Sequence, residues 1–299
     1  MRFLSYIVTK EDENSCIRDI LKKRLCASSS LLKINKVRQG TLLNGKPVYL
    51  NIKPKAGDML SLLIDDEKKG VQKEYPGAFS PDIIYEDEDI LVINKPAGAV
   101  THVSALTNAL SVEASVKKYL NADSFHAVNR LDKGTSGLMT VAKNGYIHTL
   151  LKNRLHTEDF IRNYIALCCG VPEDSCGVIE LHIARDESSA IKRRISSDGA
   201  YAKTSYKVLS YNNGLSLVLL RAHTGRTHQL RLHMSAIGCP LLGDWLYGEQ
   251  SELICRPALH SYSLRLRRPL SNDMLSLCCA PPEDILRLTS FPLSDVPFL

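Results

Sequence analysis

The amino-acid sequence predicts an α+β protein in two parts, a small basic N-terminal module and a larger body of strands with flanking helices. Three observations lead to this fold class. Apolar residues recur at helical spacing between Ile17 and Val37. Apolar runs of strand length, bounded by turn residues, recur through the rest of the chain. The length of 299 residues is enough for a sizeable core and two domains.

The composition is that of an ordinary globular protein, with 44% hydrophobic and 23% charged residues. Apolar runs are shorter than the roughly 18 residues that a membrane helix needs. Acidic residues 11–13 soon follow the short apolar start, so neither a membrane partner nor a signal peptide is expected. We therefore expect a cytoplasmic protein. The nine cysteines include no C-x-x-C pair, which argues against structural zinc and favours reduced thiols.

Positive charge is concentrated at the start of the chain. Residues 1–64 hold 12 Lys and Arg against 5 Asp and Glu, whereas the remainder holds 26 against 27. A basic module followed by a neutral body suggests a segment that attracts a polyanion, and nucleic acid is the obvious candidate. The alternative is a merely solvated basic surface.

Local signals divide the basic module into helix, helix and hairpin. Apolar positions predict a helix over 17–25, and residues 28–30 offer a serine N-cap for a second helix that Gly40 ends. Asn44-Gly45 is a hairpin turn signal, and an apolar strand-like run covers 59–64.

This order resembles the αL-type RNA-binding domain of small-subunit ribosomal proteins. The resemblance implies that basic residues of the two helices contact the RNA backbone; the candidates are Lys22, Lys33, Lys36 and Arg38. For each lysine taken singly, a solvated helix face is the alternative. We expect this domain to cover 1–66, a charged and turn-rich linker to cover 67–80, and a second domain to cover 81–299.

The second domain begins with two predicted strands, 83–85 and 90–93, and a Lys-Pro-x-Gly turn at 95–98. A short helix is predicted over 111–120. The segment N-R-L-D-K-G-T-S-G-L at 129–138 then places an acid beside an arginine in a turn, with an apolar strand behind it. A loop held by a strand is a usual setting for a catalytic carboxylate. The alternative is a β-turn whose Asp132 caps its own backbone.

Further strands and a polar cluster follow. A helix with apolar positions at 147, 150, 151 and 155 precedes a strand over 160–167 that carries Arg162-x-Tyr164. Taken singly, Tyr164 would be interpreted as a core residue. A hairpin is predicted from strands 204–209 and 215–220. Beyond it, three Arg and three His each repeat at intervals of five, namely Arg221, Arg226, Arg231, His223, His228 and His233.

Metal binding by this cluster is not predicted. Histidines five residues apart do not share one helical face, and the cluster holds no carboxylate, although Asp244 follows it. We expect Thr227 to cap a helix that runs to about Ile237, with Gly238 ending it.

Together these motifs resemble the RluA-type RNA pseudouridine synthases. The resemblance rests on 129–138, on Lys95 to Gly98, on Arg162-x-Tyr164 and on T-G-R-T-H-Q-L-R-L-H-M at 224–234, which G-x-P-L-x-G-D-x-x-Y-G follows. It covers most of 82–262. One departure is Asn129, where the usual family motif has His.

The resemblance implies isomerisation of uridine to pseudouridine within RNA, without a cofactor. It implies a mixed, mostly antiparallel sheet, with Asp132 as the catalytic carboxylate, Tyr164 stacked on the target uracil and Arg231 paired with Asp132. Arg130, Arg226 and His228 would bind the substrate. Whether the aspartate attacks the sugar or the base, or removes a sugar proton, stays open.

Two other functions are compatible with parts of this sequence. One is a catalytically inactive RNA-binding factor for ribosome assembly, although all three catalytic candidates are present. The other is a hydrolase or nuclease in which Asp132 acts with His223, His228 or His233; it would need a metal or a nucleophile–base pair that the sequence does not offer. The expected substrate is large-subunit ribosomal RNA or transfer RNA, and a monomer is expected.

Overall fold

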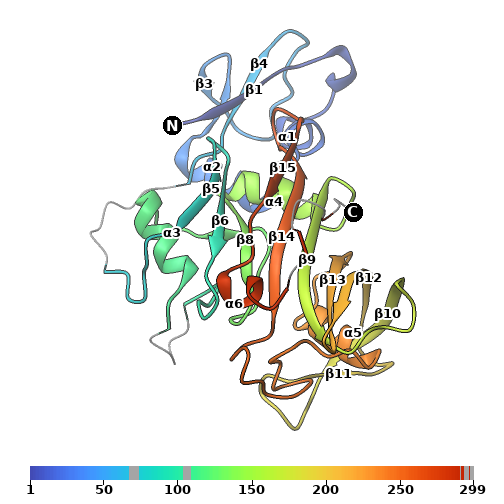
Figure 1. Cartoon of the computed structure of the whole chain (residues 1–299). Coiled ribbons are helices and arrows are strands. Elements are labelled where there is room, and N and C mark those ends of the chain that lie inside the picture. The colour runs from blue at the N-terminus through green and yellow to red at the C-terminus, as the bar shows by residue number, and fades with distance from the viewer. Residues whose placement is uncertain (67–73, 104–108, 290, 293–295, 297–299) are drawn as a thin grey trace.

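The computed structural model describes the chain except for residues 67–73, 104–108, 290, 293–295 and 297–299. The described residues form two β-sheets with helices packed beside them, which is the predicted α+β class (Figure 1). The small sheet has the strand order β1-β4-β2-β3. The large sheet has the order β11-β10-β12-β13-β9-β14-β8-β6-β5, with β15 beside β14 and β7 beside β8. No helix in the described part of the chain is long and apolar enough to span a membrane.

The small sheet and two helices form the N-terminal module. Its strands are β1 (Phe3–Ile7), β2 (Thr41–Leu43), β3 (Lys46–Pro47) and β4 (Met59–Leu63). A short 3-10 helix, η1 (Lys10–Asp12), precedes α1 (Ile17–Leu25) and α2 (Ser29–Arg38). The two predicted helices are confirmed, whereas β1 was not predicted. Apolar side chains from both helices and from β4 form one core, which includes Ile17, Ile20, Leu21, Leu32, Leu60 and Leu62.

The ends of α2 confirm one prediction and correct another. The Ser28 side chain accepts a hydrogen bond from the backbone N–H of Leu31, as expected of an N-cap. The left-handed residue at the other end is Gln39, with φ of 50°, and not Gly40. Gly40 is required for a different reason. A Cβ there would lie 2.1 Å from Oδ1 of the buried Asn35.

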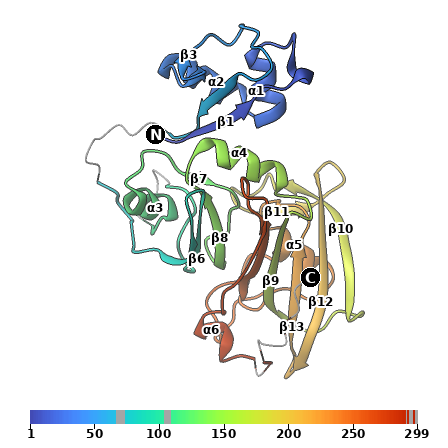
Figure 2. The same cartoon turned by 90° about the horizontal axis from the view of Figure 1, so that it is seen from above.

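The module is docked onto the rest of the chain through helix α4 (Gly145–Arg154), which lies between the module and the large sheet (Figure 2). Ile64 belongs to the same apolar cluster as Ile147 and Leu151 of α4. The hydroxyl of Tyr146 donates to the carbonyl oxygen of Leu25 over 2.6 Å. Asp66 accepts a hydrogen bond from the backbone N–H of Gly145.

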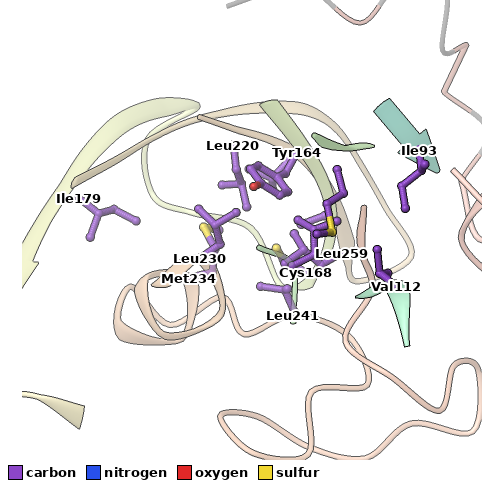
Figure 3. Close-up of a cluster of buried hydrophobic side chains, with 14 of the residues drawn as sticks. Ile93, Val112, Tyr164, Cys168, Ile179, Leu220, Leu230, Met234, Leu241 and Leu259 are labelled. Atoms are coloured by element: carbon purple, nitrogen blue, oxygen red, sulfur yellow. The ribbon is translucent and has the colours of Figure 1, made fainter. Parts of the chain in front are cut away.

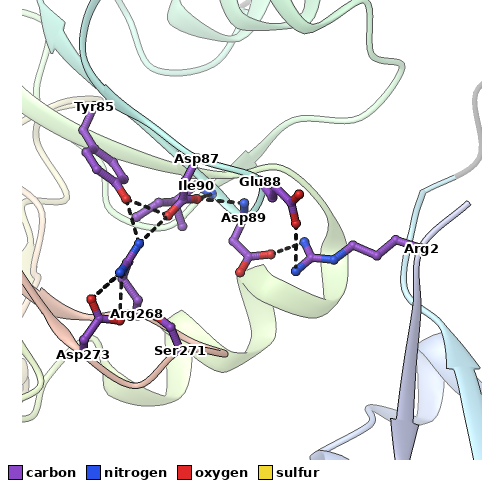
Figure 4. Close-up of polar contacts among 9 residues, drawn as sticks. All are labelled: Arg2, Tyr85, Asp87, Glu88, Asp89, Ile90, Arg268, Ser271 and Asp273. Carbon is purple, nitrogen blue, oxygen red and sulfur yellow. Dashed lines mark hydrogen bonds and ion pairs between the residues drawn. The ribbon is translucent and has the colours of Figure 1, made fainter.

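A cluster of ion pairs adds to this docking (Figure 4). The Arg2 guanidinium lies 2.5 Å from a carboxylate oxygen of Asp89 and 3.6 Å from one of Glu88. The Asp87 carboxylate accepts hydrogen bonds from the backbone of the same turn, which holds these acids in place. On the far side of the turn, Arg268 lies 3.6 Å from Asp87. The turn between β5 and β6 therefore meets both the N-terminal module and a C-terminal segment.

The large sheet is mixed and mostly antiparallel, as predicted. Its central strand β9 (Phe160–Cys169) pairs antiparallel with both β13 (Leu215–Ala222) and β14 (Leu259–Arg267). The parallel pair joins β14 to β8 (Ser136–Ala142). The other strands are β5 (Asp82–Glu86), β6 (Ile90–Lys95), β7 (His126–Ala127), β10 (Cys176–Arg185), β11 (Arg193–Ile195), β12 (Ala200–Asn212) and β15 (Met274–Cys278).

Side chains of β9 alternate between two cores, because neighbouring residues of a strand point to opposite faces. Tyr164 and Cys168 contribute to one core, together with Leu220 and Leu230 (Figure 3). Residues 165 and 167 contribute to the other core. Both faces of the central strand are therefore buried, which explains its nearly continuous apolar sequence.

The remaining helices are α3 (Val112–Leu120), α5 (Gln229–Ala236) and α6 (Glu283–Leu286). The expectation that Thr227 caps α5 is wrong. The residue before the helix is His228, in a left-handed conformation with φ of 58°, and its side chain makes no capping hydrogen bond. Because the polar loop makes its tight turn at His228, the helix begins at Gln229, one residue later than a cap at Thr227 would require. Its other end is close to the prediction, with Ile237 as C-cap and Gly238 at φ of 76°.

Candidate active site

A cleft of about 890 Å³ holds the residues of the sequence motifs. Among the described residues that line it, Asp132 is the one carboxylate. Seven cationic side chains line the same cleft: Arg130, Lys133, Lys152, Arg162, Arg193, Arg226 and Arg231. Such a balance of charge attracts an anionic ligand, and it surrounds a single acid with positive charge.

The loop that carries Asp132 is fixed by hydrogen bonds to its neighbours. Oδ1 of the buried Asn129 accepts from the backbone N–H of Thr140 on β8, at 2.9 Å. The Thr101 hydroxyl donates to the carbonyl oxygen of Leu131, at 3.0 Å. Asn129 therefore has a structural role here, since it ties the loop to the strand behind it.

Two cations, the buried Lys95 and the half-buried Arg256, hold the far side of this loop. The Lys95 ammonium donates to the carbonyl oxygens of Pro96, Ala99 and Lys133. Burial lowers the pKa of Lys95 to about 7. Arg256 donates to the carbonyl oxygen of Gly134, over 2.9 Å, from a site outside the predicted motifs.

Arg231 is buried beside Asp132, but its hydrogen bonds go to another acid. Its Nε and Nη2 donate to the two carboxylate oxygens of Asp244, at 2.7 and 2.6 Å. Its Nη1 lies 3.9 Å from Oδ2 of Asp132. Arg231 is thus held by a buried bidentate pair and directs its remaining nitrogen toward the loop aspartate. Asp244 was noted in the sequence, but its contact with Arg231 was not expected.

His228 faces the same oxygen of Asp132 from another direction. Its Nε2 lies 4.0 Å from Oδ2 of Asp132, and its Nδ1 lies 2.9 Å from the Tyr247 hydroxyl oxygen. Burial lowers the pKa of His228 below its ordinary value. Tyr247 belongs to the G-D-x-x-Y-G segment, but no sequence pattern connects it with the histidine.

Tyr164 lies in the wall of the cleft with 5% of its surface exposed. Its ring packs among Leu220, Leu230 and Leu259 (Figure 3). Burial raises the pKa of the Tyr164 phenol, so the group stays neutral at neutral pH.

Basic side chains gather at one wall of the cleft. Arg162 is buried, and its Nε has no hydrogen-bond partner among the described residues. Burial lowers the pKa of His156, and nearby Arg162, Lys152 and Arg226 lower it further. Arg226 also donates to the backbone carbonyl of residue 201. Arg130, by contrast, is exposed at the opening of the cleft.

The predicted residues of the N-terminal module lie apart from this cleft. Lys22, Lys33 and Lys36 are exposed on α1 and α2. Arg38 is half-buried, and its Nη1 donates to the carbonyl oxygen of Asp65 at 2.6 Å. The structure therefore brings together Asp132, Tyr164, Arg231, Arg130, Arg226 and His228, whereas the four module residues do not line the cleft.

The other histidines considered for hydrolysis do not line this cleft. His223 shares a hydrogen bond with Ser205 at 2.7 Å, and His233 is completely buried. No group of three metal-ligating side chains occurs among the described residues. Of the three histidines, His228 is the one placed beside Asp132.

Comparisons with known proteins agree with the fold and the motifs. A family model described as RNA pseudouridylate synthase matches residues 89–236. An uncharacterized RNA pseudouridine synthase of Bacillus subtilis, YhcT, is 33% identical over 96% of each chain. Ribosomal large subunit pseudouridine synthase D of Vibrio cholerae is 34% identical over 76% of this chain and 74% of that protein.

A solved structure supports the same assignment. Human RNA pseudouridylate synthase domain containing 1 is 27% identical, with a TM-score of 0.56 over 71% of this chain and 86% of that chain. The fold and the cleft are thus those of an enzyme that acts on RNA. This chain belongs to the RNA pseudouridine synthase family, and its motifs are of the RluA type.

Proposed function

We propose that this enzyme converts specific uridines of structured RNA to pseudouridine, with Asp132 as the catalytic carboxylate. The observation that carries the proposal is the position of Asp132. It is the one acid among the described residues of a cleft lined by seven cations, and its loop is anchored on both sides.

The reaction is an isomerisation whose atoms balance without a co-substrate. The bond between N1 of uracil and C1′ of the sugar breaks, and a bond between C5 and C1′ forms. C5 loses its hydrogen as a proton, and N1 gains one. Breaking a glycosidic bond builds positive charge on the sugar, which a carboxylate can stabilise or trap. Attack on the sugar, attack on the base and removal of a sugar proton are three routes open to Asp132.

We assign Tyr164 to the target base. A base inside folded RNA must leave its stack, at a cost of roughly a few kcal/mol. Stacking on an aromatic ring returns about 1–3 kcal/mol. The raised pKa of Tyr164 supports this role, because a neutral phenol stacks well and is a weak proton acceptor.

The basic side chains of the cleft supply phosphate contacts. We assign Arg130 at the opening and Arg226 on the wall to the RNA backbone beside the target nucleotide, because both line the cleft, and His228 borders the same space. Buried Arg162 adds a cation with an unused donor. Lys22, Lys33, Lys36 and Arg38 extend these contacts to an RNA-binding domain at 1–66, which a linker at 67–80 joins to a catalytic domain at 81–299. Such contacts give affinity and position but no sequence reading.

The substrate that we propose is large-subunit ribosomal RNA, with transfer RNA as the alternative. The support is the relative from Vibrio cholerae, which is named for the large ribosomal subunit. A ribosomal RNA substrate would place the enzyme in the cytoplasm. We propose that it acts as a monomer, since one chain contributes Asp132, Tyr164 and Arg231 to the cleft.

Pseudouridine mapping tests this proposal. Total RNA from cells with and without the gene would be treated with a carbodiimide, whose adducts stop reverse transcription at pseudouridine. We expect one or a few stops to disappear without the gene and to return with the wild-type gene. Unchanged stops, with RNA still crosslinked to the protein, would contradict the proposal and favour an inactive assembly factor.

A further inference from the structure

Tyr247 contacts both of the side chains that face Asp132. It is half-buried and belongs to the segment of chain that connects α5 to β14. Its hydroxyl oxygen is 2.9 Å from Nδ1 of His228, and its ring centroid is 5.1 Å from the guanidinium carbon of Arg231. His228 and Arg231 in turn approach one oxygen, Oδ2 of Asp132, to 4.0 and 3.9 Å.

The hydrogen bonds of the Tyr247 hydroxyl bear on which nitrogen of His228 carries the proton. The backbone N–H of Arg193 donates to the hydroxyl oxygen over 2.8 Å. The hydroxyl can then donate its own proton to Nδ1 of His228. A neutral imidazole that accepts at Nδ1 carries its proton on Nε2, and Nε2 is the nitrogen that faces Asp132. In this tautomer the ring presents a donor to the carboxylate rather than a lone pair.

This tautomer matters because His228 is uncharged at neutral pH. Burial lowers its pKa, and the cations Arg231 and Arg193 act in the same direction. The carboxylates of Asp132 and Asp244 oppose the shift without reversing it. An uncharged ring has one N–H, so only one of its two nitrogens can donate.

We propose that Tyr247 is a positioning residue for the isomerisation, whose hydroxyl fixes His228 as an Nε2–H donor toward Asp132 while its ring packs against Arg231. The inference rests on the proposed function, because it takes Asp132 as the reacting carboxylate. Two donors directed at one oxygen from 4.0 and 3.9 Å limit the orientations that the carboxylate can adopt. Donors that are already in place need no reorganisation during the reaction.

Substitution of Tyr247 by Phe removes the hydroxyl and keeps the ring beside Arg231. Activity would be measured as tritium release from [5-³H]uridine-labelled ribosomal RNA of cells that lack the gene, since C5 loses its hydrogen. We expect kcat to fall roughly tenfold, with KM within about twofold of wild type. Because burial lowers the pKa of His228, the defect should shrink only as the pH falls far enough to protonate the imidazole, which then carries Nε2–H whatever its partner. Equal rates in Tyr247→Phe and wild type, or a defect of the same size at every pH, would overturn the inference.

A double-mutant cycle separates this role from general loosening of the cleft. In a His228→Ala background, Tyr247→Phe should change kcat by less than about twofold, because the hydroxyl then has no ring to orient. His228→Gln, whose amide can donate near the Nε2 position, should retain more activity than His228→Ala. Tyr211→Phe, an exposed tyrosine on β12, is the matched control and should behave as wild type. A full Tyr247→Phe defect in the His228→Ala background would overturn the inference about Tyr247 but not the proposed function. Absence of release by the wild-type enzyme would overturn the proposed function and the inference with it.

Discussion

Lys95 shows how one buried residue can support the loop of the proposed catalytic carboxylate. Its side chain is completely buried at the end of β6. All three donors of its ammonium have backbone carbonyl acceptors, and one of these belongs to Lys133, beside Asp132. A buried cation is tolerated where its donors are satisfied, although burial still disfavours the charge. The Lys-Pro-x-Gly turn therefore connects the strand to the aspartate loop.

The titration of Lys95 predicts a pH dependence of stability. Burial lowers its pKa to about 7 in the folded protein, from an ordinary value of 10.5. Between these values the unfolded chain binds more protons at this site, so the stability of the folded protein rises with pH across this window. We expect the stability of wild type relative to Lys95→Met to increase from pH 7 to pH 9, measured as urea midpoints.

The control for this experiment is Lys118→Met, at an exposed lysine of α3. Its stability relative to wild type should not change with pH over the same range. If the urea midpoints of Lys95→Met and wild type differed by the same amount at every pH, the buried lysine would not titrate in this window.

At the scale of elements, helix α4 packs against the N-terminal module with one face and borders the cleft with another. Tyr146, Ile147 and Leu151 pack in the core shared with the N-terminal module. His148 and Lys152, four residues apart, line the cleft. Residues at this spacing share one side of a helix, so a single helix can hold the module and border the site.

Lys152 tests the contribution of this helix to RNA binding. We expect Lys152→Gln to weaken RNA binding roughly uniformly across sequences and to reduce the slope of log affinity against log salt by about one. Binding of ribosomal RNA fragments would be measured by filter retention between low and moderate salt. The control is Lys118→Gln, which removes the same charge from an exposed position on α3. An unchanged salt slope in Lys152→Gln would show that this face of α4 does not meet phosphate.

Elements with strong local signals were predicted, and elements defined by distant partners were not. The strands within β5, β6, β8, β9 and β13 follow from apolar runs between turn residues. By contrast, β14 lies between β9 and β8, more than 90 residues from β9 in sequence, and no local pattern reports such a pairing. β1 was overlooked for the same reason, since its partner is β4 at the other end of the module.

The candidate site shows the same division. The motifs placed Asp132, Tyr164 and Arg231 near one another through family resemblance, and the structure has them on one cleft. The salt bridge from Arg231 to Asp244 and the hydrogen bond from Arg193 to Tyr247 join separate segments of chain. Contacts of this kind depend on how strands and loops meet in space, so periodicity could not reveal them.

At the scale of the whole molecule, the N-terminal module and the cleft are joined by specific contacts. Tyr146 bonds to the end of α1, Asp66 bonds to the start of α4, and Arg2 pairs with Asp89. Buried Ile64 continues the apolar contact directly after β4. These contacts therefore fix the distance between the part of an RNA that binds the module and the part that enters the cleft.

Charge removal from the module tests this arrangement. We expect the triple change Lys22→Gln, Lys33→Gln and Lys36→Gln to raise KM several-fold at physiological salt, because about three phosphate contacts are lost. The value of kcat should stay within about twofold, because these lysines lie outside the cleft. Steady-state tritium release would report both constants.

The control removes three charges from the surface of the large sheet and α3, at Lys118, Lys207 and Arg265. It should leave KM near wild type. If both triple variants raised KM equally, the effect would come from net charge and not from an RNA-binding module.

The most direct measurement for the central claim compares purified wild-type enzyme with Asp132→Asn. The substitution keeps the size of the side chain and removes its charge. Tritium release from [5-³H]uridine-labelled ribosomal RNA of cells without the gene should proceed with wild type and be absent with Asp132→Asn. The two proteins should bind that RNA with similar affinity. Measurable turnover by Asp132→Asn would contradict the assignment of Asp132 as the catalytic carboxylate.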